Sequence, residues 1–370
     1  MVEKNRLFTP GPTSMFAHTL EIGSSQLPYN RTDQFSQITL EIIDGLKYVF
    51  GTQEDVVIFS SSGTGAMEAA VINFLNKNDR VLIINGGTFG ERWVELCTVH
   101  GIPYDEMKLE PGQSPLLENL DYKLSNKKYS ALLINAHETS TGVLYDTKAI
   151  GRITHKYNIL FIVDAISTIC ADTFLMDKWH VDVAVLSSQK ALALPPGISF
   201  LALNQNAKEK LKEKTSRSYY FDISEYLDNQ DRGQMPFTPA IGIFMMLHER
   251  LQNIQELGIE SAITQHIKIS NHFREGIKKL SFSIFPNTPS NALTSIKCHK
   301  GINAFELVKK LSEDFNCIVA PCAGDLKQDV FRVSHSGDQS FKDVNFLLYA
   351  IKNCLKQYSP NTNIKKSKEG

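Results

Sequence analysis

The chain has 370 residues, 42% of them apolar, and a formal net charge of −1 at pH 7. This length suffices for about two domains with sizeable apolar cores, and without a basic excess the chain is not expected to bind nucleic acid. Apolar runs such as residues 81–84 and 131–134 are far too short to cross a bilayer, and residues 1–6 are charged where a signal peptide is apolar, so we expect a cytoplasmic protein without a membrane partner.

The first half of the chain is expected to form an arm, a helix and then a sheet. Two prolines and a glycine within residues 7–13 exclude a regular helix, so this segment should extend as an arm. Apolar residues at helical spacing over 38–49 predict a helix that Gly51 ends and that Asp33 or Ser36 caps. Beyond it, β-branched runs alternate with amphipathic segments, which is typical of a mostly parallel sheet buried on both faces. The predicted strands lie near residues 56–59, 81–84, 131–135, 160–164, 182–186 and 198–203, and the predicted helices near 65–75, 90–100, 147–156 and 206–213.

The second half changes character after Asn204. Residues 208–217 are charge-rich and residues 219–239 are polar and irregular, so they are expected to connect two domains. A long helix is predicted over 241–257, with methionine and leucine side chains that fill a core. Beyond Ser290 a small α+β domain is expected, with strands near 293–297, 317–320 and 330–334 and helices near 303–313 and 340–356. The chain is therefore divided into an arm (1–20), a large domain (21–245), a small domain (246–356) and a disordered tail (357–370).

The loop at residues 60–66 has the composition of an anion site. It follows a predicted strand and begins a helix, so the amides of Gly63, Thr64 and Gly65 can converge on a phosphate. The alternative is a capped helix start in a Gly/Ser turn. The loop lacks the lysine of a P-loop and the full GxGxxG fingerprint, so neither ATP nor NAD is supported.

Two charged residues end buried strands of the predicted sheet. Lys190 follows the strand near 182–186, and partial desolvation there would favour a neutral, nucleophilic amine; the alternative is an ordinary surface lysine. Asp164 ends the strand near 160–164, where a carboxylate needs a positive or donating partner unless it caps the next turn. Parallel strands bring such loops to one edge of the sheet, where ligands bind. The loops 85–90 and 135–142 are expected at the same edge.

Taken together, these segments resemble the class V aminotransferases, and within them the alanine–glyoxylate, serine–glyoxylate and 2-aminoethylphosphonate–pyruvate transaminase group. The resemblance covers residues 7 to 356 in the correct order. It implies an α/β type I fold for enzymes that depend on pyridoxal 5'-phosphate, with a mostly parallel sheet of the seven-stranded type, helices on both faces and a small C-terminal α+β domain. The matching segments are Thr-Pro-Gly-Pro from Thr9, Ser-Gly-Thr-Gly from Ser62, His-Glu-Thr-Ser-Thr-Gly from His137, Val-Asp-Ala-Ile-Ser from Val163, Ser-Gln-Lys-Ala-Leu from Ser188, and Phe-Arg-Val-Ser-His-Ser-Gly from Phe331.

The resemblance assigns four residues to the cofactor ring. Lys190 would form the Schiff base and serve as the general base and acid. Asp164 would keep the pyridinium nitrogen protonated, so that the ring remains an electron sink. Phe89 would stack on the ring where the family often has tryptophan, and Ser140 would contact the ring or its hydroxyl.

Further residues are assigned to the phosphate. Gly63, Thr64 and Gln189 would bind it, and Thr238 would reach the phosphate of a second subunit, which implies a homodimer with shared active sites. Several alanine–glyoxylate members carry histidine where this chain has Thr64, so the subgroup stays open. We expect no metal site, since no histidine cluster has metal-ligand spacing.

The small domain contributes the expected substrate site. Arg332 can bind a substrate carboxylate through a bidentate fork, and a surface ion pair is the alternative. His335 is expected to be structural, and His137 is left without an assigned role. All six cysteines are expected to be reduced and without disulfides.

The expected function is a ping-pong transfer of an amino group from a small amino acid or aminophosphonate to a 2-oxo acid such as glyoxylate or pyruvate. A lyase or desulfurase of the same class is one alternative, and it would need a reactive cysteine, for which Cys322 is the candidate. A regulatory protein that binds the cofactor without turnover is another.

Overall fold

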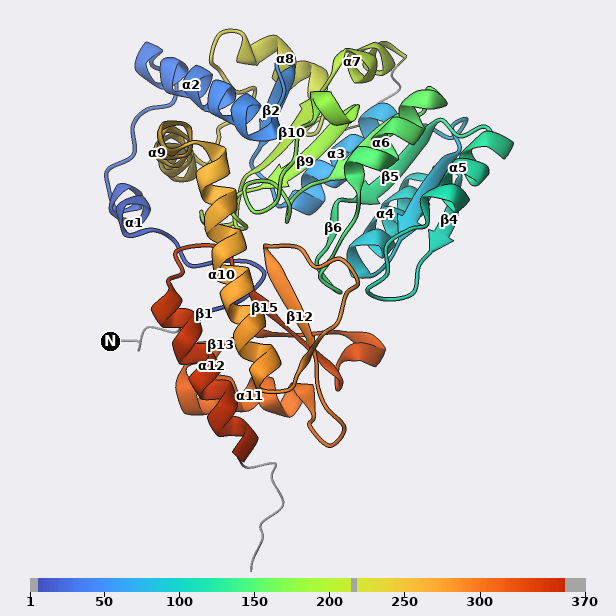
Figure 1. The fold of residues 1–370 in the computed structure, drawn as a ribbon. Coiled ribbons are helices and arrows are strands. Elements are labelled where there is room, and N and C mark those ends of the chain that lie inside the picture. The colour runs from blue at the N-terminus through green and yellow to red at the C-terminus, as the bar shows by residue number, and fades with distance from the viewer. Residues whose placement is uncertain (1–5, 214–217, 357–370) are drawn as a thin grey trace, which may run out of the picture.

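A computed structural model describes residues 6–213 and 218–356 (Figure 1). A seven-stranded sheet forms the centre of the upper lobe in Figure 1, and only β10 runs antiparallel to its neighbours. The mostly parallel sheet that the sequence predicts is therefore confirmed. In spatial order the strands are β2 (Asp55–Phe59), β10 (Ser199–Leu203), β9 (Val183–Ser187), β8 (Leu160–Asp164), β5 (Ala131–Asn135), β3 (Val81–Asn85) and β4 (Tyr104–Lys108).

All six predicted strands of this sheet are present, and one strand was missed. Strands β3, β5 and β9 are buried along their whole length, which is why they read as continuous apolar runs. The missed strand, β4, lies at the sheet edge, and its sequence Tyr-Asp-Glu-Met-Lys is only partly buried. An edge strand with charged side chains has no apolar run to reveal it.

Helices lie on both sides of the sheet (Figure 1). The four helices predicted between the strands are found within two residues of their expected ends, and the helix at 241–257 is confirmed. The cap of α2 was predicted wrongly, because Thr32 accepts the hydrogen bond from the amide of Phe35 at 3.2 Å. The helices of this lobe are α1 (Ala17–Gly23), α2 (Asp33–Phe50), α3 (Gly63–Phe74), α4 (Thr88–His100), α5 (Leu117–Asn126), α6 (Thr147–Lys156), α7 (Gln205–Lys212), α8 (Ile223–Gln230) and α9 (Ile241–Leu257).

Four of the helices were not predicted: α1, α5, α8 and α10. Helix α8 lies inside the segment 219–239 that was expected to be irregular, so that expectation was wrong in part. Its first turn is capped by Asp222, whose side chain accepts from the amide of Ser224 at 3.0 Å. Helix α10 (Ile259–Lys279) follows α9 after Gly258 and runs down into the lower lobe (Figure 1).

A four-stranded antiparallel sheet forms the lower lobe, in the order β11 (Ser283–Ile284), β12 (Leu293–Lys297), β15 (Val330–Ser334) and β14 (Ala320–Pro321). It packs with α11 (Ala304–Phe315) and α12 (Phe341–Lys356). The strand predicted near 317–320 is divided in two: β13 (Cys317–Ile318) pairs with the arm strand β1 (Arg6–Leu7), and β14 joins the sheet. A short hairpin, β6 (His137–Glu138) with β7 (Val143–Leu144), and two 3-10 turns, η1 (Asp177–Trp179) and η2 (Gly324–Leu326), complete the described elements.

The buried apolar side chains form two clusters. One surrounds the seven-stranded sheet and extends into α9 through Leu247, Leu251 and Ile254. The other joins the arm residue Phe8 to the lower sheet and its helices. The division into domains at residues 20, 245 and 356 stays a prediction, and the tail predicted at 357–370 lies outside the described residues.

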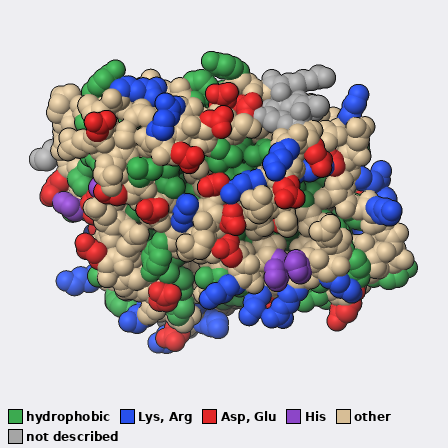
Figure 2. All heavy atoms as spheres, turned by 90° about the horizontal axis from the view of Figure 1, so that it is seen from above, with side chains coloured by type: hydrophobic (Ala, Val, Ile, Leu, Met, Phe, Trp, Pro, Cys, Tyr) green, Lys and Arg blue, Asp and Glu red, His purple; other side chains and the backbone are tan. Residues whose placement is uncertain are grey.

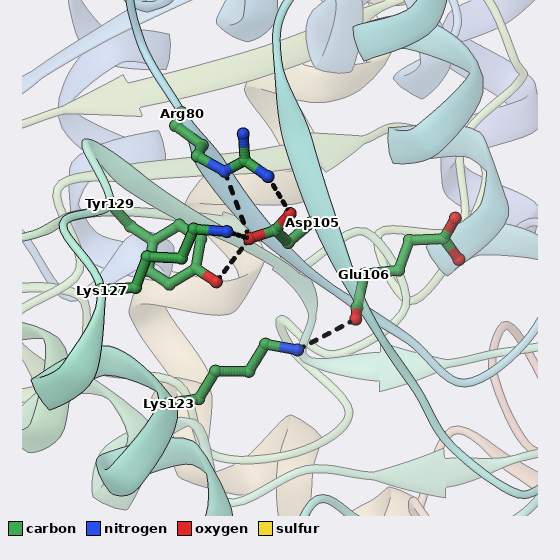
Figure 3. Close-up of polar contacts among 6 residues, drawn as sticks. All are labelled: Arg80, Asp105, Glu106, Lys123, Lys127 and Tyr129. Carbon is green, nitrogen blue, oxygen red and sulfur yellow. Dashed lines mark hydrogen bonds and ion pairs between the residues drawn. The ribbon is translucent and has the colours of Figure 1, made fainter.

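Charged side chains are spread over the surface. Figure 2 shows Lys and Arg interspersed with Asp and Glu on the face seen from above. The edge strand β4 carries one compact group, which we name the edge cluster: Asp105 accepts from Arg80, Lys127 and Tyr129 (Figure 3). In the described part of the chain no helix is long and apolar enough to cross a membrane.

Candidate active site

Lys190 lies just after β9, in a turn that the N-terminal arm covers. The hydroxyl of Thr13 donates to the Lys190 carbonyl at 2.9 Å. Gly11 packs so closely that a Cβ there would lie 2.9 Å from Lys190 Cδ and 3.1 Å from the Gln189 carbonyl oxygen. Burial lowers the pKa of the Lys190 amine to about 8, although the nearby Asp164 opposes the shift. About a tenth of the amine is therefore neutral at pH 7, far more than for an exposed lysine.

Asp164 ends β8 directly beside Asn135, which ends the neighbouring strand β5. One carboxylate oxygen accepts from the Asn135 side chain at 2.7 Å, and the other accepts from the Ile166 amide at 2.8 Å. The side chain is buried, and this burial raises its pKa to about 6. Among the described residues no cation forms an ion pair with it. The fold thus buries a carboxylate and gives it neutral partners only.

The predicted phosphate loop begins α3. Gly63 is the first residue of this helix, and a Cβ there would overlap the end of the Ile166 side chain, which would have to shift to admit a larger residue. Thr64 accepts a hydrogen bond from Arg92 of α4 at 3.2 Å. The same guanidinium lies 4.9 Å from the centre of the Phe89 ring. Arg92, which the sequence analysis missed, therefore joins the phosphate loop to the predicted stacking residue.

Glu138 organises the loops around Phe89. Its carboxylate accepts from the amides of Gly90 at 2.9 Å and Phe89 at 3.3 Å, at the start of α4. The hydroxyl of Ser140 donates to Glu138 at 2.5 Å and accepts from the Thr88 amide at 3.1 Å. Glu138 is completely buried, and burial raises its pKa. The polar loop 135–142 is predicted from the sequence, but this role of Glu138 is not. The signal was an acid in a loop next to a glycine-rich helix start.

Arg332 reaches from β15 of the lower lobe toward the same loop. Its Nη1 donates to the Thr139 carbonyl at 3.0 Å and its Nη2 to the Pro321 carbonyl at 2.7 Å. Nε is buried and has no hydrogen-bond partner in the described structure. Burial lowers the pKa of the guanidinium. No carboxylate of the described residues forms an ion pair with Arg332, so the surface ion pair that the sequence allowed is not found.

Cys322 lies next to this arginine and is buried. Its Sγ donates to the Ser140 carbonyl at 3.5 Å, and burial raises the pKa of the thiol. His335 is also buried, with Nε2 2.7 Å from the Thr294 hydroxyl and its ring against Phe273. These contacts fit the structural role expected for His335.

Two predicted cofactor residues lie at the margins of the site. Gln189 precedes Lys190 and accepts a hydrogen bond from the Ser187 hydroxyl. Thr238 is exposed, while the neighbouring Phe237 stacks on Tyr220 with ring centres 5.0 Å apart. The structure thus brings Lys190, Asp164, the phosphate loop, Phe89, Ser140 and Arg332 to one edge of the central sheet, and it leaves Thr238 at the surface.

Solved structures with the same architecture include several aminotransferases. The chain superposes on the alanine–glyoxylate aminotransferase from Nostoc sp. with a TM-score of 0.93 and 25% identity, over 96% of each chain. The family model "Aminotransferase class-V" matches residues 23–325. The protein therefore belongs to the class V aminotransferase family and is a pyridoxal-phosphate-dependent transaminase.

Two curated relatives cover nearly the whole chain. The chain is 32% identical to the "Soluble hydrogenase, small subunit" of Synechococcus sp. (strain PCC 6716), over 96% of this chain and 94% of the relative. It is 28% identical to the L-aspartate–glyoxylate aminotransferase of Paracoccus denitrificans (strain Pd 1222), over 91% and 87%. These names describe the relatives. In the described residues no group of three or more His, Cys, Asp or Glu side chains is arranged to hold a metal ion.

Proposed function

We propose that this protein binds pyridoxal 5'-phosphate at Lys190 and transfers an amino group from a small amino acid or aminophosphonate to glyoxylate or pyruvate, in a ping-pong cycle. One observation carries the proposal. A lysine amine with a lowered pKa and a buried carboxylate lie at one sheet edge, and Arg332 faces the same loops, while none of the three forms an ion pair within the described residues. The similarity to alanine–glyoxylate and aspartate–glyoxylate aminotransferases supports small 2-oxo and amino acids as substrates.

The residues fit this cofactor. Within the described residues the hydrogen-bond partners of Asp164 are neutral, and a buried carboxylate of this kind is stabilised when a protonated ring nitrogen becomes its partner. The first turn of α3 begins with Gly63 and Thr64 at a helix N-terminus, where an anion is stabilised, while the Gly65 amide donates to the Ser62 carbonyl at 2.9 Å. Thr64 and Gln189 supply further polar groups beside it. Phe89, held by Glu138 and Arg92, offers a flat face for stacking.

When bound, pyridoxal phosphate supplies an electron sink that stabilises negative charge on the α-carbon of the amino donor. The protein's residues position the reactants and move the protons. Lys190 would hold the cofactor through its amine and then take the α-proton on Nζ, a task that a pKa of about 8 suits. Asp164 would keep the proton on the ring nitrogen. Arg332 retains N–H groups beyond the two that bind carbonyls, and these would grip the substrate carboxylate.

Cys322 does not favour the alternative of a desulfurase. A catalytic thiol needs exposure and a lowered pKa. Cys322 is buried, donates to a carbonyl and has a raised pKa.

We further propose a homodimer in which Thr238 reaches the phosphate of the second subunit. Thr238 is exposed, so its hydroxyl is open to a partner chain. Its position is fixed by Phe237, which packs among Tyr219, Tyr220 and Tyr226. Light scattering of the active protein at assay concentration should give a dimer, and an active monomer would contradict a shared site.

The test of the function is a screen of amino donors against the purified protein loaded with pyridoxal phosphate. A transaminase converts the visible band of the pyridoxal form to that of the pyridoxamine form when a suitable amino acid is added, and glyoxylate or pyruvate restores it. A protein that binds the cofactor but changes its spectrum with no donor would be the regulatory alternative.

A further inference from the structure

A very small pocket lies beside Lys190, away from the phosphate loop. Pro10 of the arm, Ala292 and Leu293 form its apolar walls, and its polar lining consists of His137, Lys190, Thr139, Ser167 and Ser336. Its cavity volume is about 10 Å³. This is room for about one water-sized group. A substituent of that size on a substrate held near Lys190 would fit here.

His137 gives this pocket a hydrogen-bond acceptor. Its Nδ1 lies 3.1 Å from the Ser167 carbonyl. Because a carbonyl only accepts, Nδ1 carries the proton and Nε2 has a free lone pair in the neutral ring. The ring is 3% exposed, and burial lowers its pKa to about 4, so it is neutral at pH 7. Nε2 is buried and has no hydrogen-bond partner among the described residues.

An unpaired buried acceptor is costly. Leaving such a group without a donor costs about 1–3 kcal/mol, so a ligand that brings a donor to Nε2 gains an advantage over one that does not. The donor must be small, because the pocket admits one water-sized group. It must also lie close to the atom that reacts at Lys190. A hydroxyl on the β-carbon of an amino acid meets both conditions, since it is two bonds from the α-carbon.

We propose that His137 is a specificity-determining residue that accepts a hydrogen bond from the β-hydroxyl of the amino donor. The preferred donors are then small β-hydroxy amino acids of the serine type, rather than alanine. This inference rests on the proposed function, because it places the α-carbon of an amino donor at Lys190. Arg332 binds the carboxylate in the same arrangement. His137 of the upper lobe then binds the hydroxyl, and Arg332 of the lower lobe binds the carboxylate.

His137→Asn tests the proposal with a minimal change. The asparagine amide keeps a donor for the Ser167 carbonyl, and it removes the acceptor at the position of Nε2. In His137→Gln the longer side chain returns a polar group to that position. His266→Asn is a matched control, because His266 is also buried, bonds a carbonyl through Nδ1 at 2.8 Å and has an unpartnered Nε2, yet it lies outside the pocket.

The measurement is kcat/KM for the half-reactions of L-serine and L-alanine with the loaded enzyme. Wild type should prefer serine. His137→Asn should lower the serine-to-alanine ratio about tenfold without reducing the alanine value, His137→Gln should restore part of the ratio, and His266→Asn should leave it unchanged. Inhibition by 3-hydroxypropionate and propionate gives a readout of binding alone. The hydroxy acid should bind more tightly to wild type and lose that advantage in His137→Asn.

An unchanged serine-to-alanine ratio in a folded His137→Asn variant would overturn the proposal. Equal losses for both substrates would also overturn it, because His137 would then serve the cofactor or the fold. Thermal unfolding of each variant identifies a folding defect, in which case His137→Gln and the two carboxylic acids decide. Failure of the proposed function itself looks different: no amino donor would convert the visible band of wild type.

Discussion

The central sheet carries two polar clusters that differ in how their charged groups are paired. In the edge cluster on β4, Asp105 accepts from Arg80, Lys127 and Tyr129, and these hydrogen bonds hold its pKa well below its usual range (Figure 3). At the ends of β8 and β9, burial raises the pKa of Asp164 and lowers that of Lys190. The edge cluster satisfies its charges within the protein. In the active-site cluster no ion pair among the described residues satisfies them, as expected where perturbed groups serve chemistry.

The largest difference in transamination rate is expected between variants of Lys190 and of Lys127. Lys190→Met should reduce transamination at least about a thousandfold, because the variant loses both the attachment of the cofactor and the proton acceptor. Lys127→Met, in the edge cluster, should leave the rate unchanged. Steady-state rates of the two variants make the comparison, and a Lys190→Met enzyme with a rate near that of wild type would remove Lys190 from the mechanism.

The next largest difference in rate is expected between variants of Asp164 and of Asp105. Asp164→Asn should retain the cofactor and lose at least about a hundredfold in rate, or roughly 2.7 kcal/mol of barrier, because an amide cannot hold the ring nitrogen protonated. Asp105→Asn is the matched control and should be fully active. Single-turnover absorbance measurements give both rates. Similar rates in the two variants would mean that the ring nitrogen has another partner.

The two arginines test the carboxylate site. Arg332→Lys should lower kcat/KM for carboxylate donors and for the oxo acid by well over tenfold, because a point charge cannot replace the guanidinium fork. Cofactor affinity should hardly change, since the phosphate loop lies at α3. Arg80→Lys should alter neither quantity. An aminophosphonate donor would respond differently from the oxo acid, which would identify the donor class. Equal kinetics of Arg332→Lys and wild type would place the carboxylate site elsewhere.

The pH dependence of stability should have opposite signs at the two aspartates. In the cofactor-free protein the pKa of Asp164 is about 6 and thus above its unfolded value near 4. The folded state binds the extra proton between these values, so Asp164 makes the protein less stable as pH rises from 4 to 6, by about 1–2 kcal/mol. Asp164→Asn should remove this loss.

Asp105 has a lowered pKa, so its contribution is present above its unfolded pKa near 4 and is lost as pH falls toward the folded value. This contribution to the free energy of unfolding should be below about 1 kcal/mol, because the cationic partners Arg80 and Lys127 are exposed to solvent. Urea unfolding of wild type, Asp164→Asn and Asp105→Asn across pH 3.5 to 7 measures how the contribution of each aspartate to stability changes with pH. Slopes of the same sign would contradict the contrast between the clusters.

Much of the fold and of the site follows from the sequence, because buried parallel strands leave apolar runs and their functional residues stand at the strand ends. Lys190 and Asp164 are found in this way. The edge strand β4 is not, since it is only partly buried and three of its five residues are charged. Helix α10 was missed because α9 and α10 meet at a single Gly258, which reads as an end rather than a junction.

Long-range contacts account for the rest of the site. The partners of Arg332 are carbonyls at Thr139 and Pro321, and the bond to Thr139 spans 193 residues. Arg92 of α4 donates to Thr64 of α3, and Gly11 of the N-terminal arm packs against Lys190. A local sequence pattern cannot predict contacts between residues so far apart in the chain. The same holds for His137, whose unpartnered nitrogen is visible only once the Ser167 carbonyl is in place.

The central claim is that Lys190 is the amine that holds the cofactor. Borohydride reduction of the loaded enzyme fixes the cofactor to the lysine that carries it, and peptide mapping then locates the label. We expect a yellow protein whose label lies on Lys190 alone. A label on any other lysine, or a protein that binds the cofactor but takes up no label, would contradict it.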